Sequence, residues 1–215
     1  MAISLVIFGR QGAGKGTQSA RLSLHYGAPH ISTGDMLRAA VANRTPIGIE
    51  AQSYMDSGRL VPDDVMLGVV EERLAEPDVR ANGFLLDGFP RTVGQAKALS
   101  SFATIDVAVD LDVPEDVVIE RISSRRVCSS CGRIYSIDEP PSSDWTCDTC
   151  GGEVVQRVDD TPEAIALRLE AYATETTPTI EWYESAGLLV RVDGLGPVDD
   201  VTARLIDAID TRLGS

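Results

Sequence analysis

The chain reads Ile3-Ser4-Leu5-Val6-Ile7-Phe8 and continues directly into Gly9-Arg10-Gln11-Gly12-Ala13-Gly14-Lys15-Gly16-Thr17. A short apolar run that ends sharply at glycine predicts a buried strand of a parallel sheet. The glycines let the backbone curl so that successive N–H groups point at an anion, and a helix that begins at Lys15 adds its dipole to the same place. The stretch therefore predicts a phosphate-binding loop of the pattern G-x-x-x-x-G-K.

This loop departs from the usual pattern at one position. The hydroxyl expected right after the lysine is displaced by Gly16 and falls on Thr17. The chain has only one other lysine, Lys97, and uses arginine nearly everywhere else. A lysine is thus kept where a compact charge must lie among phosphates. The alternative is a plain glycine-rich turn, but the agreement of strand, loop, lysine and helix start favours the phosphate loop.

Length and charge limit the class of protein. At 215 residues the chain is long enough for one domain, or one core with insertions. We find neither a signal-peptide pattern nor an apolar run of membrane-spanning length, so we expect a cytoplasmic protein that does not bind membranes. The formal charge of -14 argues against a nucleic-acid binder, which would need a basic face. The anion site must therefore be local, with arginines gathered in a cleft.

Downstream, apolar runs alternate with helical patterns. Strands are expected over 29–32, 83–87, 106–111 and 188–192, and helices begin near 15, 32, 62, 92, 114, 161 and 198. The helix that begins at Thr161 is expected to continue through Tyr183. This alternation predicts an α/β fold with a doubly wound parallel sheet and helices on both faces.

Two features between these strands bear on function. The strand that ends at Asp87 places a carboxylate where phosphate-loop enzymes use one near their magnesium ion. The segment 32–61 consists of short helical patterns with polar breaks, which indicates a small mobile flap inserted between strands.

All four cysteines occur in two C-x-x-C pairs, Cys128 with Cys131 and Cys147 with Cys150. In an intracellular protein this spacing favours a tetrahedral four-thiolate zinc site over disulfides. Iron in the same cage and redox-active pairs remain alternatives, because spacing does not separate zinc from iron. Four thiolates leave no open coordination position, so the predicted role is to fold a small module.

A second group of candidate residues consists of arginines near element ends, beside glycines or the cysteine module. Any one of them alone would be interpreted as a solvated surface side chain. As a set around a phosphate loop they would neutralise several phosphate groups with planar, bidentate contacts. They are Arg38, Arg59, Arg91, Arg121, Arg125, Arg157 and Arg168.

Taken together, these landmarks resemble the adenylate kinase family in its bacterial long-lid, zinc-containing form. The matching stretches follow the family order along the whole chain. They are Gly9 to Gln18, Ser32 to Arg38, Asp56 to Val61, Asp87 to Arg91 with Gln95, Arg121 to Cys131, and Gln156 to Asp160 with Arg168. The displaced Thr17 also fits, because the loop of that family ends in Gly-Thr.

The resemblance implies a core of residues 1–31, 62–123 and 161–215, an AMP-binding flap at 32–61 and a zinc-binding lid at 124–160. It implies AMP contacts from Thr33, Arg38, Arg59, Val61, Gly88, Arg91 and Gln95. It implies ATP contacts from Gly12, Ala13, Gly14, Lys15, Gly16, Thr17, Arg121, Arg125, Ile134, Tyr135 and Gly196. Arg157 and Arg168 would clamp phosphates in transit, and Phe89-Pro90 would be joined by a cis bond. The catalytic set would be Lys15, Asp87, Arg91, Arg125, Arg157 and Arg168.

The chain departs from this family at two places. Gln11 stands where the family usually has proline, which is expected to matter little because glutamine can follow the same backbone. Asp138-Glu139-Pro140-Pro141 replaces an aromatic-Asn-Pro-Pro run in a slightly shortened lid, which bears on the adenine-facing contacts.

The reaction that the resemblance implies is MgATP plus AMP giving two ADP, with AMP, ATP and ADP as the partners of a monomeric enzyme and a structural zinc ion. The phosphate of AMP has a second pKa near 6, so it is mostly a dianion at neutral pH and needs no general base.

Three alternative functions remain. A kinase for another nucleoside monophosphate shares the core, but the segment 32–61 and Gln95 favour AMP. A phosphate-loop hydrolase would lack the flap, and a zinc-ribbon binding protein without catalysis would be expected to bind nucleic acid.

Overall fold

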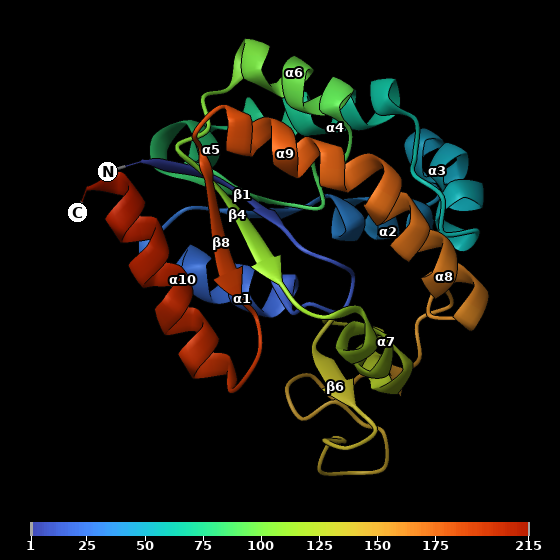
Figure 1. Cartoon of the computed structure of the whole chain (residues 1–215). Coiled ribbons are helices and arrows are strands. Elements are labelled where there is room, and N and C mark those ends of the chain that lie inside the picture. Colours follow the sequence, from blue (N-terminus) through green and yellow to red (C-terminus); the bar gives the residue numbers. More distant parts are fainter. Residues whose placement is uncertain (1, 215) are drawn as a thin grey trace.

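The computed structural model describes residues 2–214. At its centre lies a parallel sheet with the strand order β2-β3-β1-β4-β8 (Figure 1). Every neighbouring pair in this sheet is parallel, as the α/β prediction requires. The strands are β1 (Ile3–Phe8), β2 (His30–Ser32), β3 (Gly83–Asp87), β4 (Val107–Asp112) and β8 (Leu189–Asp193).

The strand sequences explain the layers on the two faces of this sheet. Alternate residues of a strand point to opposite faces, and the side chains of β1 divide accordingly: Val6 and Phe8 belong to one apolar cluster, Leu5 and Ile7 to another. Helices α4 (Asp63–Leu74), α6 (Val93–Phe102) and α9 (Thr177–Ser185) supply buried residues to the first cluster. Helices α1 (Lys15–Tyr26), α7 (Glu115–Ser124) and α10 (Val198–Leu213) supply them to the second. The doubly wound arrangement is therefore confirmed.

The helix predicted over 161–183 is present, but it contains a π-helical turn. It consists of α8 (Pro162–Ala171), a π-helical turn (Tyr172–Thr176) and α9. At the π turn the backbone N–H of Thr177 donates to the carbonyl of Tyr172. Pro178 follows, and because proline has no N–H it suits the first turn of a new helix. A short helix that the sequence analysis did not predict, α5 (Pro77–Asn82), precedes β3.

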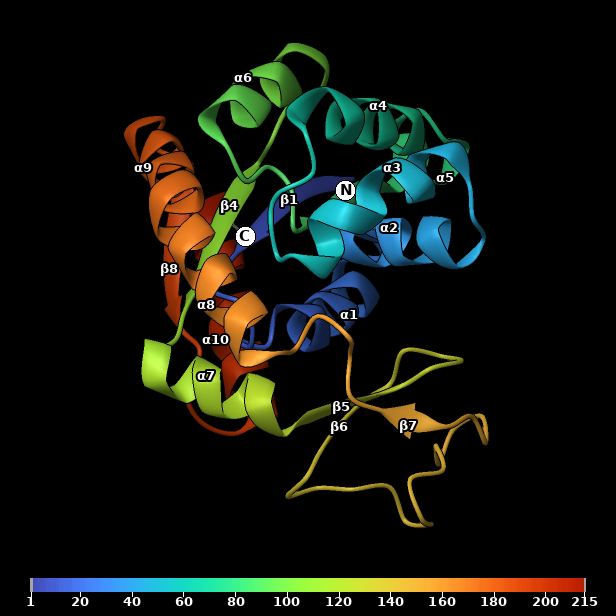
Figure 2. The same ribbon diagram turned by 90° about the vertical axis from the view of Figure 1, so that its right-hand side faces the viewer.

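Two insertions depart from the central sheet (Figure 2). One contains α2 (Thr33–Ala42) and α3 (Pro46–Asp56) and falls within the segment 32–61. The other falls within the segment 124–160 and contains an antiparallel sheet of order β6-β5-β7. Its strands are β5 (Arg125–Cys128), β6 (Ile134–Ser136) and β7 (Val154–Val155); Cys128 ends β5, and the other three cysteines lie in the loops between the strands. Within residues 2–214, no helix has the length and apolar character needed to cross a membrane.

Candidate functional site

The glycine-rich loop joins β1 to α1 in a shape that side chains would obstruct. Gly12 and Gly14 have φ values of +83° and +99°, which residues with a Cβ rarely adopt. A Cβ on Gly12 would also lie 2.8 Å from both Ile122 Cγ1 and the carbonyl oxygen of Val118. Gly14 is the residue immediately before α1, so the first N–H groups of that helix are presented beside the loop. This is the anion-binding geometry that the sequence predicts.

Lys15 supplies the positive charge of the loop. Its Nζ donates to the carbonyl oxygens of Gly9 at 2.7 Å and Arg10 at 3.1 Å. Burial lowers the pKa of the Lys15 ammonium to about 8, while the nearby carboxylate of Asp87 acts in the opposite direction. A phosphate in the loop would favour the charged lysine and would offset the desolvation.

A single cleft of about 1610 Å³ runs from this loop to both insertions. All the residues predicted to contact AMP or ATP line it, including Ile134 and Tyr135 of the 124–160 segment and Gly196 after β8. Asp87, Arg157 and Arg168 line it as well. Residues separated by up to 184 positions in the sequence therefore surround one cavity, which is large enough for two nucleotides.

The wall of the cleft around the turn after β3 is held by hydrogen bonds. The Phe89–Pro90 bond is cis, as the resemblance implies, and Gly88 and Arg91 both line the cleft. Gln95 accepts a hydrogen bond from the backbone N–H of Arg91 at 2.7 Å, and its amide nitrogen donates to Asp63 at 2.7 Å. Thr33 Oγ1 donates to the carbonyl of Asp87 at 3.3 Å. Burial lowers the pKa of Arg91, so this guanidinium lies in a site that favours an anionic partner.

Asp87 ends β3 beside the phosphate loop. A Cβ placed on Gly16 would lie 4.0 Å from Asp87 Oδ2, and His30 Nε2 lies 3.5 Å from the same oxygen. The carboxylate is mostly buried yet borders the cleft. Magnesium commonly binds through one or two carboxylates together with substrate phosphates and water. Asp87 next to a phosphate loop fits that requirement.

Two buried carboxylates that pair with arginines of the cleft were not among the predicted site residues. Asp160 accepts hydrogen bonds from Arg125 Nε at 2.9 Å and Nη2 at 2.5 Å, and Asp159 accepts one from Arg168. Asp159 and Asp160 follow Arg157 after a single residue, Val158, a spacing that could have drawn attention to them. Burial lowers the pKa of Arg157 to about 10, with Arg38 and Arg125 as further causes. The cleft thus holds several arginines close together, two of them paired with carboxylates.

The four cysteines meet at one point, as their spacing predicts. Their Sγ atoms all lie within 4.8 Å of one another, with 3.4 Å between Cys128 and Cys150 and 3.6 Å between Cys131 and Cys147. Tetrahedral zinc with bonds of about 2.3 Å needs sulfur atoms about 3.8 Å apart. Gly152 leaves room for the cluster, because a Cβ there would lie 2.9 Å from Cys128 Sγ. The residues present therefore fit a four-thiolate metal site.

Tyr135 connects this cluster to the cleft. Its hydroxyl donates to Cys147 Sγ at 3.4 Å and accepts from the backbone N–H of Asp148 at 2.9 Å. The hydrogen bond from Tyr135 lowers the pKa of the Cys147 thiol to about 6. The side chain is buried within the insertion, where its hydroxyl contacts the cysteine cluster. Strand β6, which contains Tyr135, borders the cleft.

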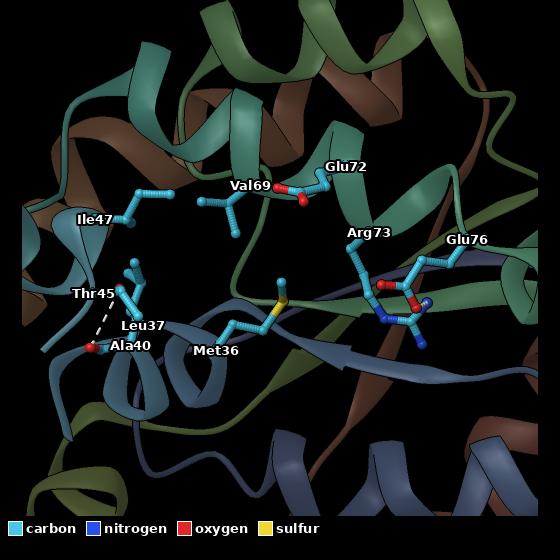
Figure 3. A pocket seen from close by; sticks show the side chains of 9 residues that line it. All are labelled: Met36, Leu37, Ala40, Thr45, Ile47, Val69, Glu72, Arg73 and Glu76. Atoms are coloured by element: carbon cyan, nitrogen blue, oxygen red, sulfur yellow. Dashed lines mark hydrogen bonds and ion pairs between the residues drawn. The ribbon is translucent and has the colours of Figure 1, made fainter. Parts of the chain in front are cut away.

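A second, smaller cavity of about 210 Å³ lies apart from the cleft, between α2, the start of α3 and α4 (Figure 3). Met36, Leu37 and Val69 give it a largely apolar wall, and Arg73 at its edge pairs with Glu76 at 3.1 Å. None of the predicted site residues lines this smaller cavity, so we place the chemistry in the large cleft.

Comparison with known proteins agrees with this geometry. The family model described as adenylate kinase matches residues 7–188. An adenylate kinase of Salinispora tropica is 47% identical over 216 residues, which cover 98% of this chain and 99% of the relative. An adenylate kinase of Thermodesulfovibrio yellowstonii is 51% identical over 203 residues, covering 92% of this chain and 94% of the relative.

The chain belongs to the adenylate kinase family. It is therefore a nucleoside monophosphate kinase, a transferase that moves a phosphoryl group between ATP and AMP. Membership also accounts for the α/β fold with a phosphate loop.

Proposed function

We propose that the cleft holds ATP and AMP end to end and that its arginines, with Lys15, stabilise the phosphoryl group as it passes directly from ATP to AMP. The observation that carries this proposal is the shape of the cleft, which joins the phosphate loop to the arginine-lined wall of the 32–61 segment without interruption. The ATP side would consist of Gly12 to Thr17, Arg121, Arg125, the Ile134-Tyr135 strand and Gly196. The AMP side would consist of Thr33, Arg38, Arg59, Val61, Gly88, Arg91 and Gln95.

The chemistry requires positioning and charge neutralisation. The AMP phosphate is already mostly a dianion at neutral pH, so no side chain has to remove a proton. Lys15 would hold the phosphates of ATP, and Arg91 the single phosphate of AMP. Arg125, Arg157 and Arg168 would neutralise the charge that spreads over the transferring group. Asp87 would hold magnesium, and the ion would supply further charge neutralisation.

The two insertions would exclude water, which competes with AMP as the nucleophile. Closure over both nucleotides would bring Arg125 and Arg157 to the phosphates only when an acceptor is present. Cys128, Cys131, Cys147 and Cys150 would bind zinc to fold the 124–160 lid, and this metal has no open position for chemistry. One chain supplies all these residues, which supports a monomeric enzyme.

A panel of acceptors tests this proposal. The purified protein is incubated with MgATP and, separately, AMP, CMP, UMP or GMP, and diphosphate formation is followed with a coupled assay. We expect AMP to exceed each of the others by about tenfold or more in kcat/KM. Equal use of a pyrimidine monophosphate would contradict the assignment of the 32–61 flap to AMP.

A further inference from the structure

Gln11 makes a contact that proline could not make. It occupies the phosphate loop, and its amide nitrogen donates to Asp160 Oδ1 at 3.2 Å, across 149 positions of sequence. Asp160 ends the segment Gln156–Asp160, which we call the lid-end segment because it leads from β7 back to α8. The bond therefore joins the phosphate loop directly to the point where the lid returns to the core.

Asp160 is the centre of a small polar network. Its side chain is fully buried, and Oδ1, the oxygen that accepts from Gln11, also accepts from Arg125 Nη2. Arg168 Nη1 lies 4.0 Å from the same oxygen. The backbone around Asp160 is fixed as well, because its N–H donates to the carbonyl of Arg157 at 3.1 Å and its carbonyl accepts from Gln156 at 3.0 Å. Anything that orients this carboxylate also orients Arg125.

The other end of the Gln11 amide shows which group fixes its orientation. Oε1 is buried and has no hydrogen-bond partner among residues 2–214. A buried acceptor without a partner is unfavourable. Turning the amide around would place its oxygen against the Asp160 carboxylate, and two acceptors would then face each other. The bond from Nε2 to Asp160 is thus the contact that determines how Gln11 lies.

We propose that Gln11 is a positioning residue that ties the lid-end segment to the phosphate loop and thereby sets the place of Arg125 at the ATP side of the cleft. This inference rests on the proposed function, in which Arg125 contacts ATP. This inference revises the expectation that having Gln11, where the family usually has proline, matters little. On the AMP side, the contacts of Arg91 with Gln95 and Gly88 do not involve Gln11, so the effect falls on ATP.

The central test is Gln11→Met, which keeps the length of the side chain and removes the amide donor and acceptor. Gln52→Met, on the exposed surface of α3, is the matched control. We expect the KM for ATP to rise about threefold to tenfold in Gln11→Met and kcat to fall as well, because Arg125 also acts on the transferring group, with the KM for AMP changed by less than about twofold. Gln11→Glu should raise the KM for ATP further, because it places a second carboxylate opposite Asp160.

A second readout does not depend on catalysis. In Gln11→Met without nucleotide, the amide of Asp160 should exchange with deuterium faster, while amides of β1 and β3 should keep their protection. In an Asp160→Ala background, which removes the acceptor, Gln11→Met should have little additional effect on the KM for ATP, because the two residues act through one bond. Gln11→Pro provides the same comparison if the methionine variant folds poorly.

An unchanged KM for ATP in both Gln11→Met and Gln11→Pro would overturn the inference, as would equal rises in the KM values for ATP and AMP. Neither result would affect the proposed function, which fails only if the unaltered protein does not transfer phosphate to AMP. If the unaltered protein does not transfer phosphate to AMP, the deuterium-exchange measurement still tests the inference, since it reports the Gln11–Asp160 hydrogen bond directly.

Discussion

The side-chain nitrogen of Lys15 lies 2.7 Å from the carbonyl oxygen of Gly9, so the lysine folds back onto the loop that contains it. Backbone carbonyls thus hold the ammonium group at the wall of the cleft. Burial of this group brings its pKa down to about 8. The lysine therefore titrates in an experimentally accessible range, and phosphate binding should shift that titration.

The first prediction concerns pH. ATP phosphates favour the ammonium form, so binding should raise the pKa of Lys15 from about 8. Well below pH 8 the lysine is protonated with or without ATP, and its contribution to affinity is complete. As pH rises above 8 the free protein loses this proton, so affinity should fall by up to about tenfold per pH unit. Calorimetric titration near pH 9, in two buffers of different ionisation enthalpy, should show proton uptake that Lys15→Met lacks. Equal uptake by both proteins would contradict this.

The second prediction separates the charge of Lys15 from the fold. Lys15→Met should reduce kcat by about 10²- to 10³-fold, because the ammonium acts mainly on the charge that develops during transfer. Lys97→Met, at an exposed position on α6, should leave kcat unchanged. Steady-state assays and melting curves of both variants provide the measurement. A Lys15→Met protein with nearly normal kcat would remove lysine from the proposed catalytic set.

The third prediction concerns metal. Chelation should release one zinc ion per chain and lower the melting temperature by about 5 °C or more, since the lid has a small apolar core of its own. Adding zinc back should restore the melting temperature of the unaltered protein but not that of Cys147→Ser. Tyr135→Phe keeps the ring but loses the bond to Cys147 Sγ, so its metal affinity should fall about tenfold or more. Elemental analysis with melting curves checks this, and four free thiols with an unchanged melting temperature would refute the zinc site.

The fourth prediction compares two glycines. Gly12→Ala should destabilise the protein by about 1–3 kcal/mol, because φ is +83° and the new Cβ would contact Ile122 and the backbone of Val118. Gly68→Ala places its Cβ in open space on helix α4 and should stabilise by about 0.5–1 kcal/mol. Urea unfolding of the two variants gives both values. A stabilised Gly12→Ala would show that the loop does not need its positive φ there.

The sequence was sufficient for the features that depend on local pattern. The apolar runs that end at Phe8 and Asp87 predicted β1 and β3 closely, because strands buried on both faces must be almost wholly apolar. The two C-x-x-C pairs predicted the cysteine cluster, because four thiolates at that spacing have few other uses.

The features that the sequence did not reveal depend on contacts between distant segments. The π turn at Tyr172–Thr176 keeps helical periodicity on both sides, so the pattern alone predicted one helix. Asp159 and Asp160 resemble ordinary surface carboxylates until the fold buries them against Arg168 and Arg125. The bond from Gln11 to Asp160 likewise exists only once the lid-end segment returns to the phosphate loop.

The most direct test of the account is whether ATP is consumed only when its acceptor is present. The purified protein is incubated with MgATP, with and without AMP, and the nucleotides are separated over time. We expect rapid formation of two ADP for each ATP and AMP consumed, and negligible ADP when AMP is omitted, because both insertions must close before the arginines meet the phosphates. Rapid ADP formation without AMP would show a hydrolase instead, and would contradict the account.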